Sequence, residues 1–280
     1  MTAPGNLVRR ARPWLGTIVE IGVPAERESA INAGFAEIAR IDRLMSFHEA
    51  TSDIAKLRRA KAGELVDVDL ATVAVLRTSA DLHKKTDGLF NVVVGRQLVR
   101  TRFLPRIVVD HLSQFSEDAG DIEIISDHQV CLRRRVLIDL GGIAKGYAVD
   151  CAVAALQAAG VRCGIVNAGG DLRVFGDLPM PIHVRTAKGG LADAFAIQNC
   201  AVASTENMRT RKTLKGEITT PHIGRDNRST VIDKTVTVVA NTCIIADAMT
   251  KVAMVEPDLA DYLLADYGGH VNRLPVSTAA

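Results

Sequence analysis

The chain has 280 residues, which is long enough for one large domain or for two lobes with an ample core. Hydrophobic residues make up 48% of it and charged residues 24%, a composition typical of a soluble globular protein. Since 34 basic residues nearly balance 32 acidic ones, the formal net charge is only +2. This balance provides no overall field that would select nucleic acid or an acidic membrane, and an aromatic content of 4% argues against a base-stacking surface.

Cysteine usage and the N-terminal residues bear on the compartment. No Cys-x-x-Cys pair occurs, so neither a zinc site nor a disulfide framework is expected, and most cysteines are predicted to be small buried residues of a reduced protein. The sequence contains no stretch of about twenty apolar residues, so no membrane-spanning segment is predicted. The basic N-terminal residues lack both the apolar segment of a signal peptide and a nearby cysteine for a lipid anchor. We therefore expect a cytoplasmic protein, or a mature exported form without its signal.

Three segments in the first third of the chain have clear periodicity. Apolar and polar residues alternate over residues 17–23, as in a half-buried strand. Residues 26–45 have apolar side chains at helical spacing, which predicts an amphipathic helix packed on the core. Residues 70–86 predict a second helix with one apolar face.

The middle of the chain reads as a connector followed by strands. Residues 104–120 are expected to form the connector, and residues 121–125 and 129–137 an antiparallel pair. The charge run Arg133, Arg134 and Arg135 is interpreted as a solvated edge that discourages the addition of another strand.

The last third is expected to contain more strands and one main helix. Strands are predicted over residues 182–185, 195–204 and 231–240, and a surface hairpin over residues 209–215. The main helix is expected to begin at residues 241–243.

Residues 136–175 hold the most informative pattern: strand, glycine turn, helix, strand, second glycine turn, strand. The first strand ends at Asp139, and Gly141 and Gly142 predict a turn that side chains would forbid. The alanine-rich residues 145–159 predict a helix, with Gly160 as its stop.

A glycine turn that opens a helix presents free backbone N–H groups, and Lys145 adds a positive charge beside them, a combination suited to a phosphate. An ordinary turn with a solvated lysine has the same residues. The second turn, Asn167-Ala168-Gly169-Gly170-Asp171, favours an anionic ligand shared by both turns.

Asp-Leu-Gly-Gly-Ile-Ala-Lys-Gly-Tyr-Ala-Val-Asp at residues 139–150 and Val-Asn-Ala-Gly-Gly-Asp at residues 166–171 resemble the signature of a flavin transferase family, the FAD:protein FMN transferases once called thiamine-biosynthesis lipoproteins. The resemblance implies an α+β fold, T-fold-like, with mixed and antiparallel sheets. Residues 1–280 would form a single flavin transferase domain, either undivided or of two lobes with the FAD site between them. It further implies metal-assisted transfer of FMN from FAD to a Thr or Ser hydroxyl of an acceptor flavoprotein, with release of AMP.

The resemblance also implies which residues bind the cofactor. His48 stands where the family has a tyrosine against the flavin nucleotide, and imidazole can still stack, with less area. Asn91 replaces the usual aspartate and keeps a hydrogen-bonding oxygen. The full implied set is Met45, Ser46, His48, Asn91, Asp139, Gly141, Gly142, Ile143, Ala144, Lys145, Asn167, Gly169, Gly170, Asp171, Ser204 and Thr205.

His222 is implied as the catalytic base that activates the acceptor hydroxyl, a task for which a histidine of near-neutral pKa is suited. His222 and Ile223 match the family pattern, whereas the Asp-Pro that usually follows is absent.

The implied metal ligands for Mg²⁺ are the Ala144 carbonyl and Asp247. The family has a threonine four residues after the aspartate, on the same helix face, but this chain has Lys251, which cannot ligate a cation while protonated. Thr250 is a possible substitute. Either Asp247, the Ala144 carbonyl and water hold the metal, or the Lys251 ammonium replaces it and pairs with Asp247.

Two other functions remain open at this point. The same site could use water as the acceptor and hydrolyse FAD to FMN and AMP. Alternatively, the substitutions at His48, Asn91 and Lys251 could mark a protein that binds flavin without transferring it.

Overall fold

The computed structural model describes residues 7–107, 111–177, 179–183 and 195–272. The chain divides into two compact units, which we describe separately. The large-sheet unit comprises Met1–Asp42, Lys145–Glu206 and Asp233–Ala280, and the small-sheet unit comprises Arg43–Ala144 and Asn207–Ile232. Within the described ranges, none of the helices combines the length and the apolar character needed to span a membrane. A single domain with a flavin site between two lobes stays a prediction.

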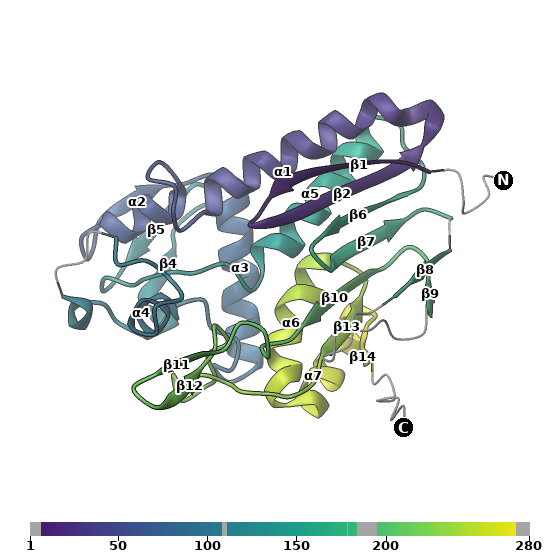
Figure 1. Ribbon diagram of the computed structural model, residues 1–280. Helices are drawn as coiled ribbons and strands as arrows, with labels where there is room; N and C mark the ends of the chain where they lie inside the picture. The colour runs from purple at the N-terminus through teal and green to yellow at the C-terminus, as the bar shows by residue number, and fades with distance from the viewer. Residues whose placement is uncertain (1–6, 108–110, 178, 184–194, 273–280) are drawn as a thin grey trace, which may run out of the picture. The chain divides into compact units, whose positions relative to one another are not determined.

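Antiparallel strands form the main sheet of the large-sheet unit in the order β1-β2-β6-β7-β10-β13-β14 (Figure 1). The strand predicted over residues 17–23 forms as β2. The strand predicted over residues 231–240 forms only at its C-terminal end, as β13. The bounds are Leu7–Trp14, Thr17–Pro24, Gly164–Ala168, Asp171–Phe175, Ala201–Thr205, Val236–Ala240 and His270–Asn272. β1 was not predicted because it is an edge strand, exposed along most of its length, and therefore lacks apolar alternation.

The helices predicted over residues 26–45, over residues 145–159 and from residues 241–243 all form in this unit, whereas a helix over Pro257–Leu264 was not predicted. α1 is preceded by a 3-10 turn over Ala25–Ala30, so the helix predicted over residues 26–45 is confirmed with a tighter first turn. The remaining short turn of the unit is a 3-10 helix over Ala265–Tyr267. Gly160 ends α5 as predicted, with φ at +81° and a hydrogen bond from the Val161 N–H to the Leu156 carbonyl. The α-helices are α1 (Ile31–Met45), α5 (Ala144–Ala158), α6 (Cys243–Val255) and α7 (Pro257–Leu264).

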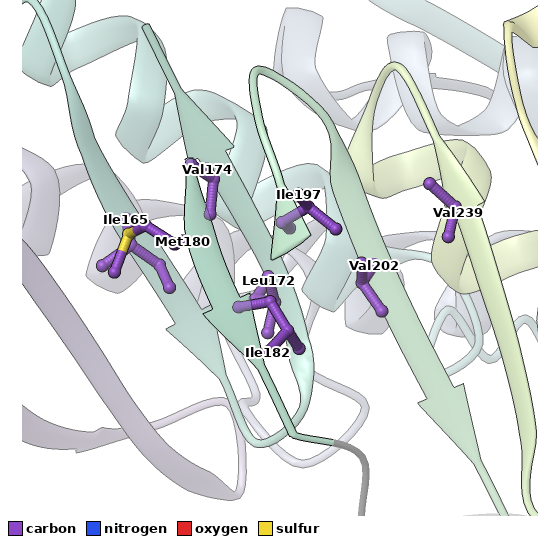
Figure 2. Close-up of a cluster of buried hydrophobic side chains, with 8 residues drawn as sticks. All are labelled: Ile165, Leu172, Val174, Met180, Ile182, Ile197, Val202 and Val239. Atoms are coloured by element: carbon purple, nitrogen blue, oxygen red, sulfur yellow. The ribbon is translucent and has the colours of Figure 1, made fainter. Parts of the chain in front are cut away.

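Both faces of the main sheet are covered at its central strands. α6 packs on β7, β10 and β13. A hairpin of β8 (Met180–Ile182) and β9 (Phe195–Ile197) contributes to an apolar cluster with side chains of β6, β7, β10 and β13, which Figure 2 shows together. Its buried members are Ile165, Leu172, Val174, Met180, Ile182, Ile197, Val202 and Val239.

The small-sheet unit is built on a three-stranded antiparallel sheet with the order β3-β5-β4. The helix predicted over residues 70–86 is confirmed as α3, which Asp69 caps. Short 3-10 turns cover Leu112–Gln114 and Ala119–Asp121, and β11 and β12 form a hairpin. The elements are α2 (Asp53–Arg59), β3 (Leu65–Asp67), α3 (Leu70–Lys85), α4 (Gly95–Arg100), β4 (Ile122–Ile124), β5 (Gln129–Leu132), β11 (Lys212–Leu214) and β12 (Glu217–Thr219).

The interpretation of the arginine run as a sheet edge was wrong. The predicted strand over residues 129–137 ends at Leu132, and β5 is the central strand of its sheet, so no edge lies there. Arg134 donates to the Asp121 carboxylate at 3.0 Å, and the Arg135 guanidinium lies 4.4 Å from the centre of the Phe115 ring. The arginines therefore hold neighbouring turns of their own unit.

The strand predicted up to Asp139 does not form as a ladder. The Gly95 N–H donates to the Leu137 carbonyl and the Asp139 N–H to the Val92 carbonyl, but α4 begins at Gly95, so the pairing cannot continue. Val136 keeps only an isolated bridge to Ser116. The buried, β-branched character of this segment reflects packing rather than a sheet.

Other predictions are corrected at their ends. The segment over residues 195–204 splits into β9 and β10, with Asn199 at a φ of +48° between them. Residues 184–185 of the strand predicted over 182–185, and residues 108–110 of the predicted connector, lie outside the described residues. The predicted surface hairpin forms, starting at Lys212.

The five cysteines are free, but only Cys243 is buried. The expectation that most of them are buried was wrong, because residues such as Cys163 and Cys200 lie in the connections before β6 and β10 rather than in the core. The other half-buried cysteines are Cys131 and Cys151.

Candidate active site

The first motif brings the start of α5 into very close contact with α6. A Cβ atom built on Gly146 would lie 2.2 Å from the Cys243 carbonyl oxygen and 2.9 Å from the Cβ atom of Asp247. Any side chain would therefore push the two helices apart. The motif needs glycine here for a close approach of two backbones, and this approach lets the Gly146 N–H donate to Asp247 Oδ2 at 3.1 Å.

Asp150 fixes the N-terminus of α6 from the neighbouring helix. Its carboxylate accepts the N–H groups of Cys243 at 3.0 Å and of Ile244 at 2.9 Å, and Arg173 donates to it at 2.7 Å. These N–H groups have no partner within their own helix, so the carboxylate caps it from outside. Burial raises the pKa of Asp150 in spite of these three bonds.

Sequence reasoning missed this role, although a signal was present. Gly146 and Asp150 are four residues apart and therefore share one helix face, which is otherwise rich in alanine. A lone carboxylate on such a face indicates a partner from a neighbouring element.

Three predicted site residues from separate elements converge beside these contacts. The Lys145 ammonium, from α5, donates to Asp171 Oδ2 at 2.5 Å and lies 3.4 Å from Asp247 Oδ2. Asp171 begins β7 and Asp247 lies on α6. Asp247 is fully buried and Asp171 is only 4% exposed, whereas the side chain of Lys145 keeps 29% of its surface in solvent. The cluster thus has buried carboxylates and a partly exposed lysine side chain.

The charges of the cluster offset the cost of burying them. Burial alone would lower the pKa of Lys145, but Asp171 and Asp247 raise it well above its ordinary value. Burial raises the pKa of Asp171, and the charge of Asp247 adds to this effect. Burial also disfavours the charge on Asp247, yet Lys145 and Lys251 outweigh it and lower the pKa of Asp247 to about 2. Asp247 is therefore a carboxylate between two cations at neutral pH.

Lys251 is enclosed by oxygen atoms of α6. Its Nζ donates to Asp247 Oδ1 at 2.7 Å, to Thr250 Oγ1 at 2.9 Å and to the Asp247 carbonyl oxygen at 3.1 Å. The Thr250 hydroxyl in turn donates to the same carbonyl at 2.7 Å. A carboxylate, a hydroxyl and a carbonyl are the kinds of oxygen that bind a hard cation, and here they bind an ammonium.

These residues do not fit the Mg²⁺ that the resemblance implies. Each carboxylate oxygen of Asp247 already accepts from an ammonium, and Thr250, the suggested substitute ligand, is buried and bonded to Lys251. A divalent cation at this carboxylate would meet strong repulsion from both lysines. Across the described part of the chain, no group of three or more His, Cys, Asp or Glu side chains is arranged to hold a metal ion.

The second glycine turn has the conformation that its sequence predicts. Gly169 and Gly170 connect β6 and β7 with φ values of +64° and +107°, and Asn167 Oδ1 accepts the Gly170 N–H at 2.9 Å. A Cβ atom on Gly169 would lie 2.4 Å from Thr17 Oγ1. The turn thereby fixes the start of β7, where Asp171 lies.

The first glycine turn differs from its prediction. The described glycines with positive φ include neither Gly141 nor Gly142, so a side chain is not forbidden there on conformational grounds. Nor are the N–H groups of this corner open: Gly141 donates to Asp139 Oδ2, and the buried residues Ile143 and Ala144 donate to the Leu140 carbonyl. The positive charge of the site therefore comes from side chains rather than from a row of backbone N–H groups.

The small-sheet unit contains a basic cavity of about 790 Å³. His48 lines it, together with Arg100, Arg102, Arg106 and Phe103. Arg102 has a φ of +64°, and its carbonyl accepts from Lys212, whose ammonium lies 4.4 Å from the centre of the Phe103 ring. No acidic residue lines this cavity among the described residues, so it favours an anion.

Several predicted cofactor residues make local hydrogen bonds. Ser46 Oγ accepts the N–H groups of His48 and Glu49, and Asn91 Oδ1 accepts the Val93 N–H at 2.8 Å. These side chains fix turns, in the manner of Ser and Asn near bends. Three further residues of the predicted set have structural positions as well. Met45 is a core residue, Ser204 Oγ lies 2.9 Å from Thr237 Oγ1, and Thr205 is the last residue of β10.

His222 lies at the base of a short hairpin in the small-sheet unit. Its carbonyl accepts the Thr230 N–H at 2.7 Å, and its N–H donates to Thr220 Oγ1 at 3.3 Å. Arg225, near the tip, donates to the Thr86 carbonyl at 3.1 Å. This hairpin stands where the Asp-Pro segment was expected, so the half-buried imidazole is held by backbone pairing.

Comparison with known proteins agrees with the resemblance. The chain is 31% identical to the FAD:protein FMN transferase of Rhodobacter capsulatus over 63% of its own length, although it spans only 36% of that protein. It is 24% identical to the FAD:protein FMN transferase of Vibrio cholerae, a match over 98% of this chain and 87% of the relative.

Solved structures show the same fold. The ApbE protein of Thermotoga maritima superposes with a TM-score of 0.82 at 24% identity, covering 95% of this chain and 93% of that one. The flavinyl transferase ApbE of Pseudomonas stutzeri gives 0.78 at 19% identity, covering 94% and 89%. The α+β class predicted from the sequence is thus confirmed. A model of the ApbE family matches residues 15–271, and the chain therefore belongs to the ApbE family.

Proposed function

We propose that this chain is an FAD:protein FMN transferase, which moves FMN from FAD to a Thr or Ser hydroxyl of an acceptor protein and releases AMP. One observation carries the proposal: two motif segments and α6 bring Lys145, Asp171 and Asp247 together in one cluster of buried carboxylates and partly exposed lysine side chains. Relatives named for this activity match 63% and 98% of this chain.

The charge of the site suits the substrate. FAD carries a diphosphate, and Lys145 and Lys251, whose side chains are 29% and 22% exposed, supply two positive charges that complement it. In the small-sheet unit, the arginines around His48 supply positive charge, and its imidazole offers a flat surface for a ring. The remaining residues implied by the resemblance stay predictions as flavin ligands.

The proposed reaction forms one bond and breaks one. The acceptor oxygen attacks the phosphorus on the flavin side of the diphosphate, and the bond from that phosphorus to the bridging oxygen breaks. AMP leaves with the bridging oxygen and its electron pair. His222 is proposed to take the proton of the acceptor hydroxyl, since a hydroxyl is a weak nucleophile until a base removes that proton.

A divalent cation, where bound, neutralises charge that develops during phosphoryl transfer. Because Asp247 and Thr250 do not fit such an ion here, no step of this proposal passes through a metal. Lys145 and Lys251 are groups of this cluster that can stabilise the negative charge.

The test is incubation of the purified protein with FAD and a Thr-containing flavoprotein acceptor domain. AMP and covalently flavinylated acceptor in equal amounts would support the transferase. AMP with free FMN would indicate the hydrolase instead. FAD that binds without any AMP would indicate a flavin-binding protein, a function that the engagement of Asp247 by two lysines favours as the second candidate.

A further inference from the structure

The position of Lys251 separates this chain from the pattern that its motifs imply. Lys251 and Asp247 are one helical turn apart on α6, and the ammonium uses three donors on three oxygens at 2.7 to 3.1 Å. An ammonium has three N–H donors, so the group is fully satisfied by these oxygens. The oxygen set that could hold a metal ion is therefore filled by a side chain.

The charges of the cluster lead to the same conclusion. Asp171 and Asp247 bring two negative charges, and Lys145 and Lys251 bring two positive ones, each within 3.4 Å of a carboxylate oxygen. The cluster is neutral without a metal. A divalent ion could enter only if the Lys251 ammonium left Asp247, which would cost the buried carboxylate its shortest contact.

We propose that Lys251 is the resident cation of this site, so that the chain binds the diphosphate of its substrate without a divalent metal ion. The inference rests on the proposed function only for the identity of the anion. The side chain of Lys251 is 22% exposed, and its longest contact, at 3.1 Å, is to the Asp247 carbonyl. That donor is the one most easily turned to a phosphate oxygen, while Asp247 Oδ1 keeps the ammonium in place.

The direct test measures metal binding without flavin. Mn²⁺ is titrated into the purified full-length chain, and free Mn²⁺ is followed by its electron paramagnetic resonance signal. The wild type is expected to leave all the Mn²⁺ free over a range in which Lys251→Thr binds one equivalent, because threonine opens the oxygen set. Lys84→Thr removes an exposed lysine of α3 and serves as the matched control, expected to behave as the wild type.

Two results would overturn the inference. One is a wild type that binds an equivalent of Mn²⁺ as tightly as Lys251→Thr. The other is a folded Lys251→Thr protein that gains no Mn²⁺ binding. Circular dichroism establishes folding, and the wild-type titration decides by itself if the variant does not fold.

A flavin titration distinguishes failure of this inference from failure of the proposed function. FAD fluorescence is followed on addition of protein in excess EDTA and in millimolar Mg²⁺. We expect the same Kd for wild type in both buffers, and at least tenfold tighter binding in Mg²⁺ than in EDTA for Lys251→Thr. If the wild type binds FAD only in Mg²⁺, the role of Lys251 as resident cation is contradicted, but the proposed function is not. If the wild type binds no FAD in either buffer, the proposed function is contradicted, and the Mn²⁺ titration then decides the inference about Lys251.

Discussion

The ammonium of Lys145 lies 2.5 Å from the carboxylate of Asp171, although one residue lies in the first turn of α5 and the other begins β7. The two motifs are thus joined by an ion pair that is largely removed from solvent. Each motif positions one residue of the ion pair. The close contact at Gly146 fixes α5 against α6, and the turn at Gly169 and Gly170 leads into β7.

Gly146→Ala should destabilise the large-sheet unit by about 1–3 kcal/mol, the usual cost of overpacking. Its Cβ atom would meet backbone atoms of α6, which cannot move aside as a flexible side chain can. Urea unfolding followed by circular dichroism measures the change. Gly120→Ala is the control, since its nearest neighbour is the flexible Asp118 carboxylate, and a change within about 0.5 kcal/mol is expected. Equal stabilities of the two variants would contradict the role given to Gly146.

Asp150→Ala should cost about 1–2 kcal/mol, because the two N–H groups at the start of α6 lose their carboxylate cap. Hydrogen exchange is expected to increase first at Cys243 and Ile244. Unchanged protection at these two amides would show that the cap does not hold the helix.

The pKa of Asp247 predicts how acid affects stability. Its folded pKa, about 2, lies below its ordinary value, so the folded chain binds this proton less tightly than the unfolded chain. The contribution is present above about pH 4 and is lost as the pH falls toward 2, and it amounts to roughly 2 kcal/mol. Asp247→Asn should therefore be less stable at neutral pH and should lose part of the acid dependence. Parallel stability curves for wild type and variant from pH 5 to pH 2 would contradict this sign.

His222→Asn should lower the transfer rate about 10²–10⁴-fold, the range that general base catalysis contributes. The Kd for FAD should stay unchanged, since the imidazole is proposed to act on the acceptor. Single-turnover transfer and FAD fluorescence separate these effects. His128→Asn, at an exposed turn, is the matched control. A full transfer rate in the variant would remove His222 from the mechanism.

The basic cavity predicts an effect on FAD affinity. Arg102→Gln should raise the Kd about tenfold, equivalent to about 1.4 kcal/mol, and should weaken the dependence of binding on salt. Arg133→Gln, which changes an exposed arginine of the same unit, should have little effect. If both variants bind FAD as the wild type does, the cavity does not take the substrate.

The sequence predicted the residues of the cluster better than their environment. Lys145, Asp171 and Asp247 each lie within a short sequence motif, so the motifs alone were enough to predict them as site residues. The partner of Lys251 was left open, because the choice between a metal and an ammonium depends on distances within one turn of α6. The arginines at the cavity were missed: Arg106 lies in the segment interpreted only as a connector, and Arg100 and Arg102, just before it, stand in none of the motifs.

The fold was predictable where one face of an element is buried. α1, α3 and β2 have a clear apolar period and were placed within a few residues. β1 and α2 were missed for different reasons: β1 is an edge strand with few buried residues, and α2 has only seven residues, fixed by the Ser52 cap. The segment before Asp139 has the composition of a strand, but the segment that it pairs with continues as α4 from Gly95. Whether such a segment forms a strand depends on neighbours that are distant in sequence.

The most direct test of flavin transfer is the intact mass of an acceptor domain after incubation with FAD and this chain in excess EDTA. We predict that the acceptor gains the mass of FMN less one water, in step with AMP release, and that added Mg²⁺ changes neither the yield nor the rate. An acceptor that keeps its original mass with and without Mg²⁺, while FAD remains bound and intact, would contradict the transferase.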